Sequence, residues 1–235
     1  SSQRQAAALL LTNLLYIQQS LYLHLGWLTR AQDCLDEMQA LLAVAEHDAQ
    51  WQEQDFYWRW ADTVLALNCG DFAGAHARAR KMLAYLGNCD LVFWPWRVEI
   101  GNRFWQMHML GMMGLTARLL GDYVAAATHS ESANRLSDEM GERRFQALSL
   151  CDIAVLWQLA GDYEQARSVA QRGLALSQQF GDQILAAHIE LTLGAIAIDT
   201  GQYTLANELC RHSLAVALET GKHPLHIRSL VALAE

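Results

Sequence analysis

Proline is nearly absent from this chain, with only Pro95 and Pro224 among 235 residues. Proline interrupts helices because it lacks a backbone N–H and clashes with the preceding turn, so almost the whole chain is free to be helical. Alanine and leucine, both good helix formers, dominate the composition. The alternation of apolar and polar residues that marks strands is also missing. These features together predict an all-α protein.

The chain also lacks the marks of several other classes of protein. No apolar run approaches the roughly 18 residues that cross a bilayer, and no basic start with a small-residue cleavage site opens the sequence. The five cysteines are scattered and form no CxxC pair, which argues against a zinc site or a redox motif. A net charge of −8 opposes attraction to phosphate backbones, and Arg78, Arg80 and Lys81 are interpreted as a solvated helix face. We therefore expect a soluble, cytoplasmic protein with reduced thiols and no direct contact with membranes or nucleic acids.

Groups for catalysis or metal binding are present but not suitably spaced. None of the nine histidines falls in a metal-ligand motif. The acidic pairs Asp36–Glu37 and Asp138–Glu139 are neighbours in sequence and point about 100° apart on a helix, which does not suit a catalytic dyad. No phosphate-binding loop of the GxxxxGK[ST] type occurs. We expect no catalytic residue, no metal site and no cofactor, and hence a protein that is not an enzyme.

Glycine recurs at every twentieth position from Gly121 to Gly221. Glycine suits the left-handed conformation that ends a helix, and an acidic residue after it can cap the next helix. Asp122, Asp162 and Asp182 follow three of these glycines. The period therefore predicts antiparallel helices of roughly sixteen to eighteen residues, two in each forty-residue unit.

The first half of the chain carries the same turn more loosely, at Gly26 and Gly70. Small residues follow the turns in one column, at Ala31, Ala75, Ala126, Ala166 and Ala206, and a second small column holds Ala133, Gly173 and Ser213. We expect one helical-repeat domain over residues 1–235, with units at about 1–48, 49–96 (including an insertion at 87–96), 97–140, 142–180 and 182–220, and a partial helix at 222–235.

The positions of these small and aromatic residues resemble the tetratricopeptide repeat. Ala154 and Gly194 lie seven residues before turn glycines, with Tyr163 and Tyr203 nine residues further on. HEAT and armadillo repeats share the forty-residue period but not this pattern. The consensus proline is missing and the helices are about a turn longer, as in MalT-like sensor arrays. The resemblance implies an all-α, right-handed α-solenoid of antiparallel helix pairs.

In a tetratricopeptide solenoid the first helix of each pair, the A helix, lines the concave face, and the second is the B helix. The resemblance therefore places a largely apolar stripe there for partner binding: Tyr57, Trp60, Val64, Leu67, His108, Leu115, Arg118, Leu148, Val155, Gln158, His188 and Leu191. Such a stripe suits an amphipathic helix, a hydrophobic segment or another part of the same polypeptide. The alternative is that these residues pack against neighbouring helices.

Tryptophan is concentrated before residue 106, where seven of the eight occur. Large amphipathic rings are favoured where proteins meet ligands. The set Trp58, Arg59, Trp94, Trp96, Arg97 and Trp105 is therefore a candidate effector platform, and the alternative is that these rings fill gaps between repeats of unequal length.

The ends of the chain carry no polar capping repeat, so we expect a fragment of a longer protein. The exposed end faces could also support oligomerisation. The leading hypothesis is a non-enzymatic protein-interaction or sensor module that binds a protein or peptide in its concave groove. The alternative is a small-effector-binding regulatory domain of a MalT-like signalling ATPase or transcription regulator.

Overall fold

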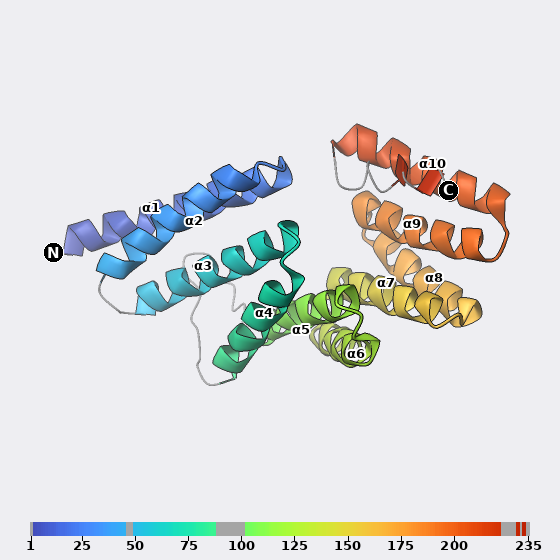
Figure 1. The fold of residues 1–235 in the computed structure, drawn as a ribbon, viewed down its shortest axis with the longest axis horizontal. Coiled ribbons are helices and arrows are strands. Elements are labelled where there is room, and N and C mark those ends of the chain that lie inside the picture. Colours follow the sequence, from blue (N-terminus) through green and yellow to red (C-terminus); the bar gives the residue numbers. More distant parts are fainter. Residues whose placement is uncertain (1, 46–48, 88–101, 222–228, 231, 234–235) are drawn as a thin grey trace. The chain divides into compact units, whose positions relative to one another are not determined.

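The computed structural model describes residues 2–45, 49–87, 102–221, 229–230 and 232–233. Within these residues the chain forms ten helices and no strand (Figure 1), so the all-α prediction is confirmed. The expected insertion at 87–96 lies outside the described residues beyond Gly87. Of the expected partial helix at 222–235, residues 229–230 and 232–233 are helical and the others lie outside the described residues.

The chain divides into two compact units, Ser1–Gly121 and Asp122–Glu235. The helices of the first unit are α1 (Ser2–His24), α2 (Leu28–Val44), α3 (Ala49–Asn68), α4 (Phe72–Leu86) and α5 (Asn102–Leu119). Those of the second are α6 (Tyr123–Met140), α7 (Arg143–Leu159), α8 (Tyr163–Gln179), α9 (Gln183–Asp199) and α10 (Tyr203–Thr220). Helices α5 to α10 have 17 or 18 residues each, as the period predicts, whereas α1 has 23 and α3 has 20.

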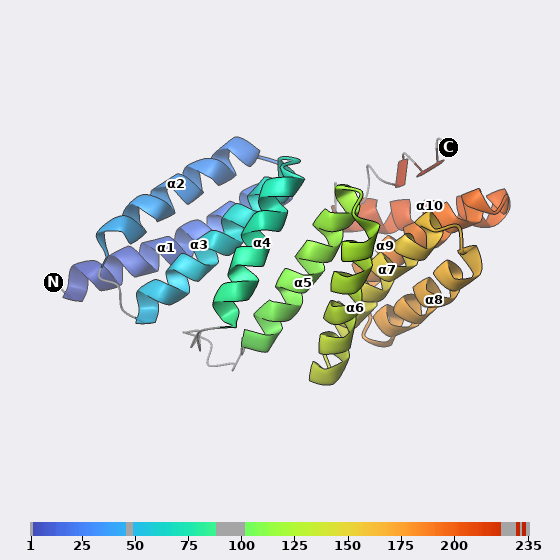
Figure 2. The same ribbon diagram turned by 60° about the horizontal axis from the view of Figure 1, so that its bottom comes forward.

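Successive helices pack side by side within each unit. In the first unit α4 lies between α3 and α5 (Figures 1 and 2), and α1 also contacts both α2 and α3. In the second unit α7 packs on α6, α8 and α9, and α9 packs on α10. The A helices of neighbouring pairs also touch, at α1–α3 and α7–α9.

The turn glycines adopt the left-handed conformation that the sequence predicts. Gly161 has φ +80°, its N–H donates to the carbonyl of Gln158, and the N–H of Asp162 donates to the carbonyl of Trp157. This pair of hydrogen bonds is a Schellman motif, which satisfies carbonyls that the end of α7 would otherwise leave free. The other turn glycines share the positive φ: Gly26, Gly70, Gly121, Gly141, Gly181, Gly201 and Gly221.

The aspartate after a turn glycine begins the next helix. A side-chain oxygen of Asp162 accepts the backbone N–H of Gln165 at 3.1 Å. Asp71, Asp122 and Asp182 make the equivalent hydrogen bond to the residue three positions on. One residue thus ends a helix with its N–H and starts the next with its carboxylate, which is why the helix pairs repeat with so short a connection.

The small columns lie where helices approach most closely. Ala75, Ala126 and Ala166 have no exposed surface, and Ala206 is 4% exposed. A Cβ atom on Gly173 would stand 3.1 Å from the Ala147 carbonyl oxygen. Larger residues could not enter these positions without separating the helices, so the two columns set the spacing within the repeats.

Apolar clusters form the core on either side of these columns. In the first unit, one cluster joins α1, α2 and α3 around Leu35 and Met38, and another joins α3, α4 and α5 around Phe56 and Met109. In the second unit the main cluster joins α7, α8 and α9 around Ile189, and a smaller one joins α9 and α10.

Candidate functional site

The predicted A-helix stripe of the first unit lies on α3 and α5 as an aromatic strip. Tyr57, Trp60, Val64 and Leu67 are all half-buried and pack against the cluster of α3, α4 and α5. The ring of Trp60 stands 6.1 Å from that of His108 on α5, with the two planes nearly perpendicular. The rings of Trp60 and His108 therefore support the packing of α3 against α5 and also form part of the surface.

Tyr57 is held by a buried acid. Burial first, and then the neighbouring charge of Glu53 and a hydrogen bond with it, raises the pKa of Tyr57 well above its ordinary value. Glu53 is 2% exposed. Tyr16 on α1 stacks at 5.2 Å from the Tyr57 ring, and burial raises the pKa of Tyr16 as well. Both phenols thus stay protonated and the strip extends from α1 to α5.

The α5 part of the stripe ends in an incompletely bonded cation. His108 Nδ1 lies 2.9 Å from the Phe104 carbonyl oxygen, and Leu115 is half-buried. Arg118 Nε is enclosed and has no hydrogen-bond partner among the described residues. A buried donor without a partner is costly; this atom is enclosed, but Arg118 as a whole is only half-buried.

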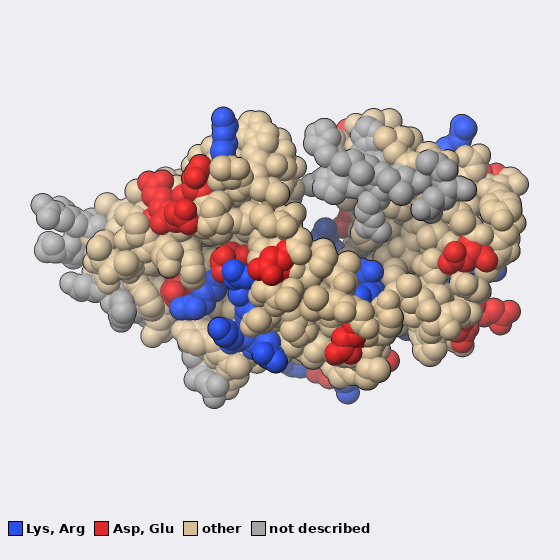
Figure 3. All heavy atoms as spheres, viewed as in Figure 1, with Lys and Arg blue, Asp and Glu red and all other residues tan. Residues whose placement is uncertain are grey.

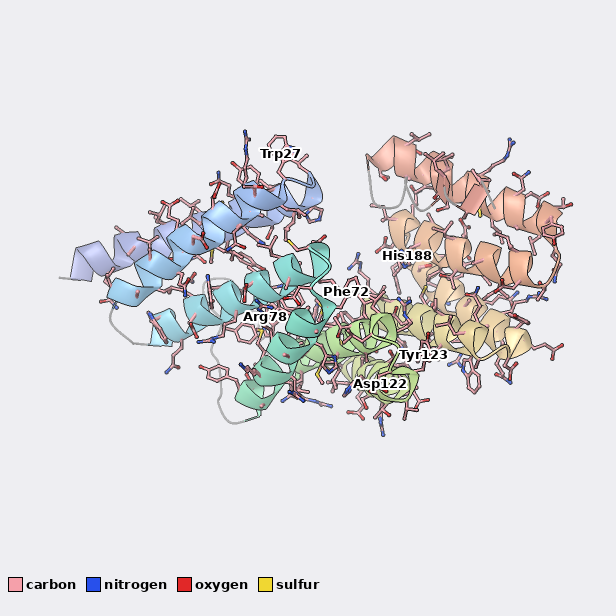
Figure 4. The ribbon with its side chains drawn as sticks, in the orientation of Figure 1. Trp27, Phe72, Arg78, Asp122, Tyr123 and His188 are labelled. Carbon is pink, nitrogen blue, oxygen red and sulfur yellow. The ribbon has the colours of Figure 1, made fainter. Side chains whose placement is uncertain are left out.

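In the second unit, two residues of the predicted stripe support the packing of α9. Gln158 Nε2 on α7 donates to Asp199 on α9 at 2.7 Å. Leu191 is 4% exposed and belongs to the cluster of α9 and α10, so it supports α9 from within. Leu148, Val155 and His188 are half-buried, and Figure 4 marks His188 on α9.

The candidate effector platform is not one surface in the structure. Trp105 is 7% exposed and lies inside the cluster of α3, α4 and α5. Trp58 faces away from it: its Nε1 donates to the Leu35 carbonyl of α2 at 3.0 Å. Trp94, Trp96 and Arg97 lie outside the described residues. Residues 58 and 60 are about 200° apart on a helix, which is why Trp58 does not join the strip of Trp60.

Trp58 and Arg59 instead line a cavity of about 490 Å³ between α3 and α4. Arg59 forms two hydrogen bonds with Asp55, at 2.7 and 3.1 Å, while Lys81 lines the cavity without an ion pair among the described residues. Figure 3 shows Lys and Arg gathered with Asp and Glu on this part of the surface. The cavity combines an aromatic wall with a lysine that is unpaired within the described part of the chain.

Arg78 has a structural role at this cavity that the sequence did not indicate. Its Nε lies 2.7 Å from Asp62 of α3 and its Nη1 lies 3.2 Å from Asp71, the N-cap of α4 (Figure 4). Burial lowers the pKa of Arg78, but Asp62 and Asp71 outweigh burial and leave the pKa raised. The interpretation of Arg78, Arg80 and Lys81 as a solvated face did not include these ion pairs of Arg78, whose side chain is 38% exposed, because the partners lie on another helix and two turns away.

A second hollow was not anticipated from the sequence. It encloses about 420 Å³ between α6 and α7, and Tyr123, Leu156 and Trp157 are among its walls. The sequence feature that could have indicated this hollow is Ala127, a small residue at the position that Arg167 occupies one forty-residue unit later. The lining is apolar apart from Thr128 and Glu131.

Metal binding, membrane insertion and triad catalysis find little support in the described part of the chain. No group of three His, Cys, Asp or Glu residues there is placed to hold a metal ion. The described helices include none that is both long enough and apolar enough to span a membrane. His212 Nδ1 and Glu190 Oε2 form a pair at 2.5 Å across α9 and α10, without a third group of a catalytic triad beside them among the interactions of the described residues.

The fold is that of tetratricopeptide-type helical repeats, in which antiparallel helix pairs follow one another. No family model matches the sequence, and no curated protein matches it. Solved structures do: aspartyl phosphate phosphatase F from Bacillus subtilis superposes with a TM-score of 0.70 at 12% identity, over 94% of this chain and 54% of that one. RapI in its apo form gives a TM-score of 0.66 at 11% identity, over 89% and 71%.

A third similar structure is a signal transduction ATPase with numerous domains (STAND) from Pyrococcus horikoshii, which has a tetratricopeptide repeat sensor. Its TM-score is 0.66 at 15% identity, over 97% of this chain and 33% of that one. This chain thus spans about half the length of the phosphatase and a third of the STAND protein. At such identities the likeness establishes the fold.

Proposed function

We propose that this chain is a non-enzymatic interaction or sensor module that binds a partner peptide along the A-helix strip of α3 and α5. The observation that carries the proposal is the half-buried row Tyr57, Trp60 and His108, which ends at Arg118. Rings that are neither fully buried nor fully solvated are the usual anchors of interfaces. The tetratricopeptide repeat sensor of the similar STAND protein supports the same class of role.

The chemistry of the strip selects an apolar peptide that carries an acid. Its rings and Val64 offer an apolar surface, and the half-buried Arg118 offers a cation that forms no ion pair among the described residues. The buried acid Glu53 is bonded to Tyr57. A carboxylate from the partner would satisfy Arg118 and form a charge-assisted hydrogen bond.

A matched pair of labelled peptides tests the proposal. Both are model helices of about twelve residues with leucine at i, i+3, i+4 and i+7; the Leu/Glu peptide has glutamate elsewhere and the Leu/Lys peptide has lysine. Fluorescence anisotropy is measured in about 150 mM salt, which screens the net charge of the chain. We expect Arg118→Gln to weaken the Leu/Glu peptide about fivefold or more, and Arg80→Gln, an exposed arginine on α4, to leave it unchanged.

The proposal fails if the Leu/Glu peptide does not bind, or if the two arginine variants weaken it equally. Equal loss would mean that net charge, and not the strip, attracts the peptide. Thermal melts of both variants establish that each is folded before the affinities are compared.

The cavity between α3 and α4 supports a second candidate function, the binding of a small effector. Its volume of about 490 Å³ is in the range of small-ligand sites. Trp58 and Tyr85 supply rings and Lys81 supplies a cation, which suits a ring-bearing molecule with an acidic group. A panel of sugars and nucleotides should contain one that raises the melting temperature, and Lys81→Gln should abolish that rise while Arg80→Gln keeps it. No rise with any compound of the panel would remove this candidate.

A further inference from the structure

The groove between α6 and α7 is an exposed apolar surface that belongs wholly to the second unit. Val124 is 80% exposed, Tyr123 is 52% exposed and Trp157 is 40% exposed. Figure 4 shows Asp122 and Tyr123 at the N-terminal end of α6. Exposed apolar residues are ordinary when scattered, but these three line one hollow, and contiguous patches of this kind mark interaction sites.

The repeat explains why this groove is open. Arg167 on α8 occupies the position of Ala127 one unit later, and its Nη2 lies 3.4 Å from Thr200 Oγ1 at the end of α9. In the first unit, His76 follows the small-column residue Ala75 as Ala127 follows Ala126, and its Nδ1 lies 2.9 Å from Thr116 Oγ1 of α5. At both junctions a polar side chain bridges from the B helix to the next A helix. Ala127 is too short to do so.

The opposite wall shows the same contrast. Trp157 on α7 stands where α9 has Ala197, which is 1% exposed, and Leu156 stands where α9 has Ile196, which is fully buried. Leu156 is only half-buried. The α6–α7 junction thus exposes side chains that the α8–α9 junction covers, although the small column of Ala126 and Ala166 is equally buried in both.

This surface is distinct from the A-helix strip. On α7 the groove residue Trp157 lies about 200° around the helix from Val155, a residue of the predicted stripe. The α6 side of the groove comes from a B helix. Loss of binding at one surface therefore leaves the other in place.

Charge identifies the occupant. Glu131 is the one charged residue that lines the groove, and it is exposed and makes no ion pair among the described residues. Residues 122–235 contain fourteen Asp and Glu against eight Lys and Arg, a net charge of −6 out of the −8 of the chain. An apolar groove with an unpaired acid in an acidic unit complements a partner that is both apolar and basic.

The length of the groove sets the form of the partner. Tyr123 to Glu131 is nine residues of α6, a rise of about 12 Å over eight steps of 1.5 Å. This is about two turns of a helix, enough for apolar anchors at i, i+3 or i+4, and i+7. We propose that the α6–α7 groove binds a basic amphipathic helical peptide, with its apolar anchors between Tyr123 and Trp157 and a lysine or arginine against Glu131.

The Leu/Lys peptide is the probe, and Ala127→Arg is the central variant. Arginine at this position imitates Arg167, which the same position holds in the next unit. The side chain would fill the groove and repel the peptide, and we expect affinity for the Leu/Lys peptide to fall at least tenfold. Ala215→Arg, the same change at an exposed position of α10, should leave affinity unchanged.

Charge reversal provides a second, independent readout. Glu131→Lys should weaken the Leu/Lys peptide about fivefold and strengthen the Leu/Glu peptide, in line with the modest value of an exposed ion pair. Glu208→Lys, an exposed residue of α10, should change neither. Because Arg118→Gln acts on the A-helix strip, it should not affect the Leu/Lys peptide, which separates this inference from the proposed function.

Three results would overturn the inference: no binding of the Leu/Lys peptide to the unchanged chain at millimolar concentration, equal loss in Ala127→Arg and Ala215→Arg, or equal affinity for both peptides in Arg118→Gln, in which the strip is weakened. The first excludes this occupant, the second places the peptide elsewhere and the third removes the charge argument. Melting temperatures of Ala127→Arg and the unchanged chain should agree within about 2 °C, the shift expected from about 1 kcal/mol in a chain of this length.

Discussion

Asp182 caps α9 and pairs with Arg144, and the two contributions together predict how much free energy of unfolding is lost when it is replaced. Its Oδ1 accepts the backbone N–H of Leu185 at 2.9 Å and so caps α9. Its Oδ2 accepts Arg144 Nε at 2.7 Å from the first turn of α7. Loss of a cap typically costs about 1 kcal/mol. The ion pair adds about 0.5 kcal/mol, since the Arg144 side chain is 71% exposed.

Asp182→Ala should therefore lower the free energy of unfolding by about 1.5 kcal/mol. At about 2.1 cal/mol/K per residue, cooperative unfolding of this chain has an entropy near 0.5 kcal/mol/K, so the melting temperature should fall by about 3 °C. Asp162→Ala is the matched control, because Asp162 caps α8 and forms no ion pair among the described residues. It should cost about 1 kcal/mol. Circular dichroism with urea and with heat measures both variants.

The pH dependence of the same site has a defined sign. Partial burial raises the pKa of Asp182, but the N–H of Leu185 and the Arg144 guanidinium outweigh it and hold the pKa below its ordinary value. A carboxyl with a lowered folded-state pKa stabilises the protein above its unfolded pKa of about 3.9, and this contribution disappears as pH falls through the folded value. The difference in free energy of unfolding between the unchanged chain and Asp182→Asn should thus be present at pH 7 and disappear below about pH 4.

Two observations would refute this reasoning. One is a cost for Asp182→Ala no greater than that for Asp162→Ala, which would mean that the bridge to Arg144 contributes nothing. The other is a difference in free energy of unfolding between the unchanged chain and Asp182→Asn that grows on acidification, which would require a raised pKa for Asp182. A double-mutant cycle with Arg144→Ala isolates the bridge, with an expected coupling of about 0.5 kcal/mol.

Three further predictions concern the scaffold. Gly173→Val should destabilise the protein by about 1–3 kcal/mol in urea titrations, since even a Cβ there would meet the Ala147 carbonyl oxygen at 3.1 Å; no loss would mean that the helices are less closely packed than described. Gly161→Ala should cost about 1 kcal/mol in the same assay because of the φ of +80°, and an unchanged midpoint would contradict the left-handed turn. Cys69→Ser should remove one fast-reacting thiol in a native titration with an aromatic disulfide, since Cys69 is exposed whereas Cys34, Cys151 and Cys210 are buried; an unchanged fast phase would contradict that exposure.

The scaffold was predictable because its rules are local. A left-handed turn needs glycine, a free helix start takes an aspartate such as Asp162, and a close crossing needs a small residue such as Ala166. Each requirement falls on one position and recurs with the repeat, so one sequence shows it several times. The Schellman turn at Gly161 and the full burial of Ala166 follow directly from this.

The surface was less predictable because it depends on side chains from different helices. Trp58 and Trp60 look alike in sequence, yet one donates to a carbonyl of α2 and the other meets His108 of α5. Arg78 looks solvated until Asp62 of the neighbouring helix is placed beside it. Helical periodicity gives the direction in which a residue points but not the partner that it finds there.

The repeats differ in the residue that directly follows the buried small column. Ala75, Ala126 and Ala166 are small and buried in every case, because the crossing of the helices allows nothing larger. The next residue is free of that constraint, and it is His76, Ala127 or Arg167. Two of these side chains bridge to the following A helix and the third leaves a hollow of about 420 Å³. At these three junctions, the residue after the small column distinguishes the two that are bridged from the one that is open. In a chain built from such repeats, an open groove can arise by shortening one side chain, and the missing bridge is what marks it here.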